Sequence, residues 1–237
     1  MGNIFRFFFL PVTALILISC SNINKQLSCE EILDTTYMNS SLNNFEKNKF
    51  KDLFINRYPE YDLMFQEAAD ETNIEKNLLA AISFQESQWD PKAISNMGVR
   101  GMMMVTLETA ALVGVEKRLN PEQNIKGGAR YFAMLKEKNK IGPTEADQLS
   151  IVLASYNLGP TNIIKVANLV NSNVEDVLWN EIKDELSVIK GEDLSLSDSG
   201  SYSRGQQAID YVDRVKNYYQ LLSAYSCVAP KDQLTFF

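Results

Sequence analysis

The chain has 237 residues, of which 45% are hydrophobic and 22% charged, and its formal net charge is −7. This composition fits one globular domain with a sizeable core, and the acidic balance argues against a nucleic-acid-binding surface. The absence of histidine excludes serine–histidine and cysteine–histidine nucleophiles and histidine-based metal sites. Acid–base chemistry near neutral pH would therefore use carboxyl, lysine or tyrosine side chains, and we expect neither a metal nor an organic cofactor.

Residues 1–19 combine one positive side chain, Arg6, with an apolar run that is short for a membrane span, which favours a signal peptide. The Leu-Ile-Ser-Cys sequence at 17–20 resembles a bacterial lipoprotein box, in which Cys20 becomes the lipidated first residue. An ordinary signal peptide and an uncleaved anchor are the alternatives. Asn22 resembles an outer-membrane sorting signal, so we expect a lipid anchor in the outer membrane of a Gram-negative bacterium, on its periplasmic face.

Two further cysteines, Cys29 and Cys227, stand near opposite ends of the mature chain. An oxidising compartment favours a disulfide between them, which would tie the mature N-terminus to the last helix. Two free thiols are the alternative. Residues 20–56 are rich in Asn, Ser and Lys, and we interpret them as a tether with one weak helix around 29–37.

From residue 57 to 228 the pattern predicts a single, mainly α-helical domain, followed by a tail at 229–237. The segment at 90–105 contains Pro91, Gly98 and Gly101 and predicts a loop with short extended pieces. Asn120 followed by Pro121 is a typical helix start, and the glycine pair within that helix indicates close packing. The other expected helices cover 59–70, 74–88, 107–113, 144–157, 162–170, 174–189 and 206–225, with a loop at 191–205.

The helix at 74–88 carries the main candidate for catalysis. Residues 72–75 read as a capping box at its start. Leu78, Ile82 and Glu86 are spaced i, i+4 and i+8, so an apolar stripe ends in a carboxylate. Partial desolvation raises the pKa of such a carboxyl, and a protonated carboxyl near neutral pH is the acid that glycoside cleavage needs. A solvated or salt-bridged glutamate is the common alternative.

Five motifs follow one another in the part of the chain that begins at Glu86. They are Glu86-Ser87-Gln88-Trp89-Asp90-Pro91, then Gly98-Val99-Arg100-Gly101-Met102-Met103-Met104-Val105-Thr106, then Asn120-Pro121 with Asn124-Ile125 and Gly127-Gly128, then Ala154-Ser155-Tyr156-Asn157-Leu158-Gly159-Pro160, and finally Tyr202-Ser203-Arg204-Gly205 before Tyr211-Val212. This ordered series resembles the catalytic domain of the soluble-type lytic murein transglycosylases, glycoside hydrolase family 23, and within it the membrane-bound F type. The resemblance covers roughly residues 58 to 226.

The resemblance implies a lysozyme-like (goose-type, SLT) helical domain with a short extended or β-like loop after the catalytic helix. It also implies cleavage of the β-1,4 bond between N-acetylmuramic acid and N-acetylglucosamine in peptidoglycan. The substrate's own C6 hydroxyl attacks, and a 1,6-anhydromuramic acid end forms. Glu86 would serve as acid and then as base. Asp90 is the nearest second carboxylate, but Asp-Pro favours a turn.

The resemblance also assigns substrate-contacting roles, each with a plainer alternative. The serines could instead cap the helix end or order the loop, the tyrosines could pack in the core, and two of the three consecutive methionines are expected in the core. Trp89 is expected to be a core aromatic residue that excludes water from the Glu86 pocket, rather than a surface on which a sugar ring stacks. The substrate-contacting set is Ser87, Ser95, Met103, Met104, Tyr156, Asn157 and Tyr211.

Two other biochemical functions stay open at the level of the sequence, and so does a specialised role in opening the wall for a secretion or pilus machine, which would use the same enzymology. A goose-type-lysozyme-like muramidase would share the fold and use water. A non-catalytic murein-binding lipoprotein would keep the site without turnover. Under each reading the partners are peptidoglycan glycan strands and, through Cys20, a membrane.

Overall fold

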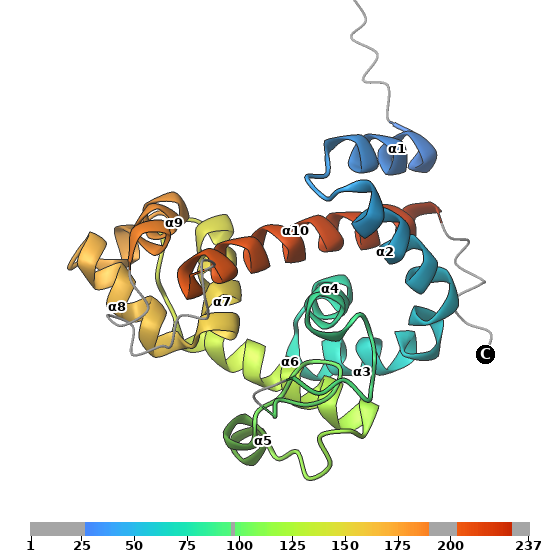
Figure 1. The fold of residues 1–237 in the computed structure, drawn as a ribbon, viewed down its shortest axis with the longest axis horizontal. Helices are drawn as coiled ribbons and strands as arrows, with labels where there is room; N and C mark the ends of the chain where they lie inside the picture. Colours follow the sequence, from blue (N-terminus) through green and yellow to red (C-terminus); the bar gives the residue numbers. More distant parts are fainter. Residues whose placement is uncertain (1–26, 96–97, 190–202, 229–237) are drawn as a thin grey trace, which may run out of the picture.

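The computed structural model describes residues 27–95, 98–189 and 203–228. The leader at 1–19, Cys20, the tail at 229–237 and most of the loop predicted at 191–205 lie outside the described residues. The described part is helical, with a short non-helical segment after the fourth α-helix (Figure 1). Its elements are α1 (Cys29–Asn39), α2 (Asn44–Asn56), η1 (Tyr58–Glu60), α3 (Asp62–Thr72), α4 (Lys76–Ser87), α5 (Leu107–Val113), α6 (Pro121–Lys138), α7 (Glu145–Leu158), α8 (Pro160–Val170), η2 (Val174–Asp176), α9 (Trp179–Val188) and α10 (Arg204–Val228).

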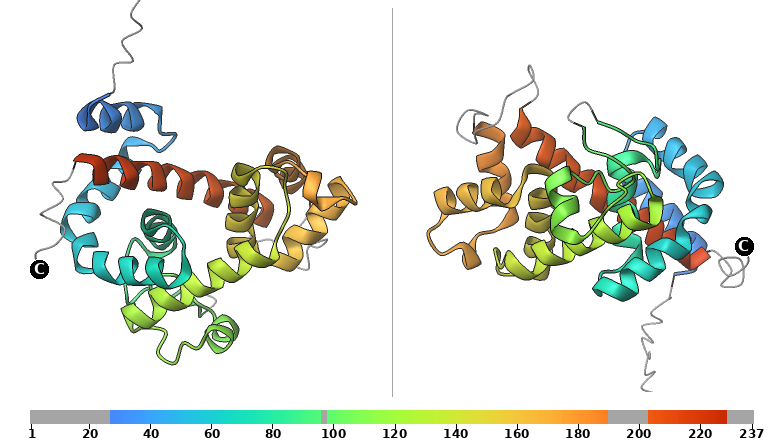
Figure 2. Two further views of the ribbon diagram at one scale, coloured as in Figure 1. Left: turned by 180° about the vertical axis from the view of Figure 1, so that it is seen from behind. Right: turned by 90° about the horizontal axis from the view of Figure 1, so that it is seen from below.

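The long helix α10 organises the molecule. It runs from the α8–α9 end to the α1–α2 end and packs on α4, α7, α9 and α1 (Figure 1). Helix α6 packs on α3, α5 and α7 and so connects the two ends beneath it. Both views of Figure 2 show α8 and α9 at one end and α2 and α3 at the other. Helices α4 and α7, which carry the candidate site, lie between them.

The segment after α4 pairs as predicted, in short extended pieces. Two isolated antiparallel bridges join Ile94 to Arg100 and Arg100 to Val105. Within the described residues this is the only β pairing. The mainly α fold with a β-like loop after the candidate catalytic helix is therefore confirmed.

The helix predicted around 29–37 is confirmed as α1, but the tether interpretation is wrong for the rest of the part of residues 20–56 that the structure describes. Helices α1 and α2 each begin with a complete capping box, at Ser28 and Asn43. Phe50 and Leu53 of α2 are buried in the core. The Asn- and Lys-rich composition describes the exposed faces of these helices, whereas two apolar side chains one turn apart suffice to attach α2.

The capping box predicted at 72–75 is also wrong. Thr72 is the last residue of α3, and its hydroxyl donates to the Ala68 carbonyl instead. Asn73 ends α3 in the left-handed region, at φ 54°. The helix predicted at 174–189 is divided into η2 and α9, and the one predicted at 59–70 into η1 and α3.

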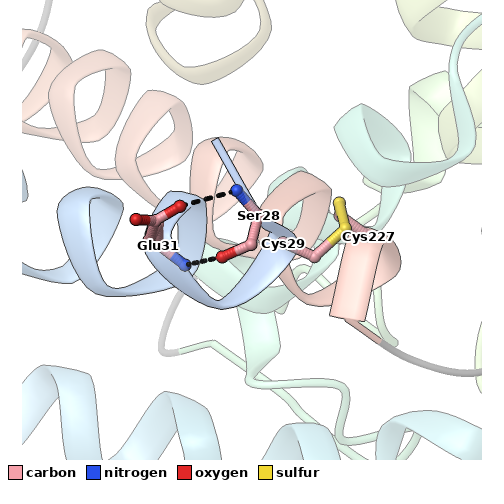
Figure 3. The surroundings of a disulfide bond; sticks show 4 residues. All are labelled: Ser28, Cys29, Glu31 and Cys227. Carbon is pink, nitrogen blue, oxygen red and sulfur yellow. Dashed lines mark hydrogen bonds between the residues drawn. A yellow bond between two sulfur atoms is a disulfide. The ribbon is translucent and has the colours of Figure 1, made fainter. Parts of the chain in front are cut away.

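Cys29 and Cys227 form a disulfide that joins the first turn of α1 to the last turn of α10 (Figure 3). Their Cα atoms are 5.4 Å apart, and 198 positions separate them in the sequence. The side chains of Ser28 and Glu31 cap α1 beside this bond. The bond thus closes a covalent loop around nearly the whole described structure.

Candidate active site

Glu86 lies in the last turn of α4, and the backbone just after it is tightly held. Gln88 and Trp89 both adopt left-handed conformations, at φ 54° and 58°, which ends the helix abruptly. The Arg57 guanidinium donates to the Gln88 carbonyl at 2.9 Å, and the Trp89 indole donates to the Ala80 carbonyl at 2.9 Å. These contacts fix the helix end, and hence the place of Glu86, against the core.

Trp89 is a core residue, as predicted. It has no exposed surface, and its ring contacts Phe50, Tyr58 and Phe84. Phe50 precedes the domain predicted to begin at residue 57, and Tyr58 lies at its start, so α2 and η1 support the base of α4.

The Glu86 carboxyl is the described acidic group with the most perturbed protonation. Glu86 is partly buried, and desolvation raises its pKa from 4.5 to about 7, while the Tyr211 hydroxyl acts in the opposite direction. The Tyr211 hydroxyl is buried and makes no hydrogen bond of standard geometry, but it lies near enough to Glu86 to interact with its carboxyl. At neutral pH the carboxyl is thus poised between acid and base.

Tyr156 approaches Glu86 from α7. Burial, and after it the charge of Glu86, raises the pKa of the Tyr156 phenol well above its usual range. Its hydroxyl donates to the Met103 carbonyl at 2.8 Å. The next residue, Asn157, has a buried side-chain oxygen without a hydrogen-bond partner, and such a group is satisfied by water or by a ligand. The structure therefore brings Glu86, Tyr156 and Tyr211 together from α4, α7 and α10.

The two serines make contacts within the protein. The Ser87 hydroxyl donates to the Met102 carbonyl at 2.8 Å and shares a contact of 3.1 Å with the Ser83 carbonyl. The Ser95 hydroxyl accepts the Val99 amide at 3.1 Å and orders the loop. Direct contact of either serine with a substrate remains a prediction.

The assignment of Met103 to the substrate-contacting set is wrong for this structure. Its side chain has no exposed surface, and it packs so closely on α6 that a Cβ at Gly128 would lie 2.4 Å from its own Cβ. Methionine is equally suited to a core and to a sugar subsite, so the residue type did not decide its place. Met104, at φ 47°, is partly exposed and stays a candidate.

Asp90 is a turn residue rather than a second catalytic carboxylate. Its carboxyl accepts the Lys92 amide at 2.9 Å. Among the described residues, neither Asp90 nor any other carboxylate contributes to the pKa shift of Glu86.

Asn124 belongs to the site's framework; it stands in one of the five motifs, but no functional role was predicted for it. It is fully buried on α6, and its side chain bonds the loop at 98–105. The available signal was its spacing: Asn124, Gly128 and Phe132 lie on one face, so a polar side chain interrupts the apolar stripe of the helix.

A family model described as "Transglycosylase SLT domain" matches residues 63–177. Membrane-bound lytic murein transglycosylase F 1 of Alkalilimnicola ehrlichii is 41% identical over 167 residues, which cover 70% of this chain and 34% of that protein. Membrane-bound lytic murein transglycosylase F of Maricaulis maris is 39% identical over 170 residues, covering 71% and 37%. The chain thus spans about a third of the length of these curated relatives.

The fold is also similar to a solved structure. An inactive mutant of lytic transglycosylase Slt from Pseudomonas aeruginosa matches 86% of this chain and 32% of its own, with a TM-score of 0.54 and 14% identity. At that identity the likeness concerns the fold, and it agrees with the lysozyme-like architecture expected from the sequence.

Proposed function

Residues 63–177 belong to the transglycosylase SLT domain family, and from this premise we propose that the protein is a lytic murein transglycosylase. It would cleave the β-1,4 bond between N-acetylmuramic acid and N-acetylglucosamine in peptidoglycan. The observation that carries the proposal is Glu86: a partly buried carboxyl, raised in pKa to about 7, that ends the helix α4 and meets two tyrosines. The names of the relatives, which call them murein transglycosylases, support the same substrate.

Glu86 acts twice in the proposed reaction. Its carboxyl proton passes to the glycosidic oxygen, and the bond from that oxygen to the muramoyl C1 breaks. The resulting carboxylate takes the proton of the muramoyl C6 hydroxyl while the C6 oxygen bonds to C1. The acid is thereby regenerated, no water is consumed, and the product ends in 1,6-anhydromuramic acid. A pKa near neutrality suits both steps, since neither protonation state is strongly disfavoured.

The surroundings of Glu86 favour this route over hydrolysis. Inverting and retaining hydrolases use a second carboxylate as base or nucleophile. Asp90 is engaged in a turn, and no other described carboxylate acts on Glu86. A goose-type-lysozyme-like muramidase that positions water by other means is the second candidate. A murein-binding protein without turnover is the third, and the perturbed acid argues against it.

We further propose that Cys20 carries a lipid anchor in the outer membrane, with the domain in the periplasm. The lipoprotein-like sequence at 17–20 and the membrane-bound names of the relatives support it. Over the ranges 27–95, 98–189 and 203–228, no helix is long and apolar enough to cross a bilayer. The Cys20→Ser variant should move from the membrane pellet to the soluble fraction, and retention in the pellet would contradict the anchor.

The Glu86→Gln variant tests the function. It removes the ionisable group with little change in volume, so release of soluble fragments from purified sacculi should fall by about 10²–10⁴-fold. Pelleting with sacculi and the thermal transition should persist. Turnover comparable to the parent protein would refute the assignment of Glu86.

A further inference from the structure

The peptide group between Met102 and Met103 is held from both of its sides, and Asn124 provides one of the two holds. The Asn124 side-chain oxygen accepts the Met103 amide at 2.7 Å. Its amide nitrogen donates to the Arg100 carbonyl at 2.9 Å and to the Arg118 carbonyl at 2.8 Å. Its acceptor and both of its donor hydrogens are engaged, so its orientation is fixed.

The Met102 carbonyl and the Met103 amide belong to the same planar trans peptide and point in opposite directions. The bond from Asn124 to the amide therefore directs the carbonyl towards α4. There it accepts the hydroxyls of Ser83 at 3.1 Å and Ser87 at 2.8 Å. Ser87 is the immediate neighbour of Glu86 in the sequence. The hydrogen bond between Asn124 and this peptide is therefore connected, through the Met102 carbonyl, to the residue beside the acid.

The carbonyl of Met103, one residue further along the loop, accepts a hydrogen bond from a second hydroxyl near Glu86. The Met103 carbonyl accepts the Tyr156 hydroxyl at 2.8 Å, and Tyr156 lies close enough to Glu86 to sense its charge. The two loop carbonyls accept the hydrogen bonds that the hydroxyls of Ser87 and Tyr156 donate. In other directions these hydroxyl oxygens therefore offer only acceptor lone pairs. Neither hydroxyl can then donate to the Glu86 carboxylate.

The loop is built closely around Asn124. Gly101 has φ +82°, and a Cβ there would lie 2.3 Å from the Arg118 carbonyl and 2.4 Å from the Asn124 nitrogen. A residue with a side chain would therefore displace Asn124. On the outer side, the Arg118 guanidinium donates to the carbonyls of Gly98 at 3.0 Å and Val105 at 3.1 Å. The peptide that Asn124 holds has little freedom to turn.

We propose that Asn124 is a positioning residue for Glu86. Through the Met102–Met103 peptide it orients the hydroxyl of Ser87, the residue next to Glu86 on α4, and through the adjoining Met103 carbonyl it orients the hydroxyl of Tyr156 on α7. Only the catalytic readout of this proposal rests on the proposed function.

The first test reads Glu86 without turnover, by a carbon-13 carboxyl NMR titration assigned with Glu86→Gln. The described ionisable groups that act on Glu86 are Tyr211 from α10 and Tyr156 from α7. Asn124→Leu changes no charge, and it should free the hydroxyls of Ser87 and Tyr156 from the two loop carbonyls. Donation by these hydroxyls to the Glu86 carboxylate should then lower the Glu86 pKa by about half a pH unit or more. Asn124→Ser, which leaves room for water, gives the same comparison if the leucine variant does not fold.

Asn217→Leu is the matched control. Asn217 on α10 also uses its whole amide: it accepts from Ser40 at 2.8 Å and the Ser41 amide at 3.0 Å, and donates to Ser41 at 3.0 Å and the Asp213 carbonyl at 2.7 Å. None of these partners connects to Glu86. This variant should lose stability while the Glu86 pKa stays at the parent value.

The second test is kinetic. On sacculi, Asn124→Leu should lower kcat about tenfold with KM within about twofold, because positioning acts on the reacting step. In a Tyr156→Phe background its effect should shrink, since one of the two hydroxyls is already absent. If Asn124→Leu matches Asn217→Leu, with lower stability but unchanged Glu86 pKa and kcat, the proposal is overturned. An inactive parent protein would refute the proposed function, and the titration would still decide on Asn124.

Discussion

Glu86 combines two properties that oppose each other at the scale of one residue. Burial raises its pKa to about 7, which suits proton transfer, but the same burial disfavours the carboxylate that prevails above that pH. The folded state therefore carries an energetic cost at alkaline pH for keeping this acid where it is. That cost gives a thermodynamic signature independent of catalysis.

Glu86→Gln should stabilise the protein, and the gain should grow with pH. The pKa of Glu86 is raised on folding from 4.5 to about 7, so its contribution to stability is fully present below pH 4.5 and is lost as pH rises to 7. Glutamine does not ionise, so the difference between variant and parent should increase by on the order of 1–3 kcal/mol from pH 5 to pH 8. Urea unfolding at both pH values measures it.

An exposed glutamate provides the control for that comparison. Glu137 is exposed near the end of α6, and Glu137→Gln should change the unfolding free energy by less than about 0.5 kcal/mol at either pH. An equal gain for the two variants, or no pH dependence for Glu86→Gln, would contradict the burial of the acid.

Tyr211→Phe should move the pH profile of activity in the direction opposite to Asn124→Leu. The Tyr211 hydroxyl holds the Glu86 pKa down, so its removal raises that pKa. Since the reaction needs the protonated acid, the alkaline limb of kcat/KM should shift upward by about half a pH unit or more. Tyr218→Phe, on the same helix but beside Glu46 and Arg214, should leave the limb in place. A downward shift in Tyr211→Phe would exclude the donor role.

The role of a single residue could be predicted from the sequence only where its residue type, or its place among the ordered motifs, fits one kind of position in the fold. Glu86 became the catalytic candidate through the ordered motifs that follow it, because a glutamate near a helix end is by itself more often solvated or salt-bridged. Met103 could not be placed, because a methionine fits a core and a cleft equally well, and the structure buries it. The role of Asn124 was missed because a polar residue that interrupts an apolar stripe shows that the side chain needs partners, but not that these partners are backbone groups of a distant loop.

At the scale of elements, α2 links the N-terminal region to the candidate catalytic helix. Phe50 is fully buried and contacts Phe84 of α4, Trp89 just after it and Tyr218 of α10. The base of α4 thus rests partly on a residue that precedes the matched family domain. Helices α2 and η1 therefore belong to the folded unit that carries Glu86 and are not an appendage.

Phe50→Ala should reduce the unfolding free energy by about 3–5 kcal/mol, because it leaves a cavity among aromatic rings. Phe45, five residues earlier in α2, is 77% exposed, and Phe45→Ala should cost less than about 0.5 kcal/mol. Urea denaturation of both variants provides the comparison. Equal and small losses would restore the tether interpretation of this region.

Helix boundaries were predictable where a local signal marks them. Asn120 and Thr106 cap α6 and α5 with their side chains, and Gly114 ends α5 in the left-handed region. The capping box predicted at 72–75 is wrong because these residues end α3 and form the turn into α4. Helix α2 was missed because its attachment depends on tertiary contacts of a few side chains, not on its average composition.

At the scale of the whole molecule, the two ends of the described chain meet. Helix α1 packs on α10, the Tyr37 and Tyr225 hydroxyls are hydrogen-bonded, and Cys29 is joined to Cys227 (Figure 3). The same α10 carries Tyr211 to Glu86. Closure of the chain and support of the site therefore share one helix.

Replacing both Cys29 and Cys227 by alanine should lower the unfolding free energy by about 2–5 kcal/mol, since the bond restricts a long loop in the unfolded chain. The protein should begin at residue 21, so that Cys20 does not form other disulfides. Thermal unfolding with and without a thiol reductant measures the effect. The reductant should destabilise the parent and leave the double variant unchanged; equal transitions in all four samples would contradict a stabilising disulfide.

The most direct test of the central claim is mass spectrometry of the soluble products after incubation of residues 21–237 with purified sacculi in ¹⁸O-labelled water. Attack by the substrate's C6 hydroxyl uses no water, so we predict muropeptides that are lighter by one water than reducing-end products and free of the label. Reducing-end products that carry ¹⁸O would contradict it, because they would show that Glu86 assists hydrolysis.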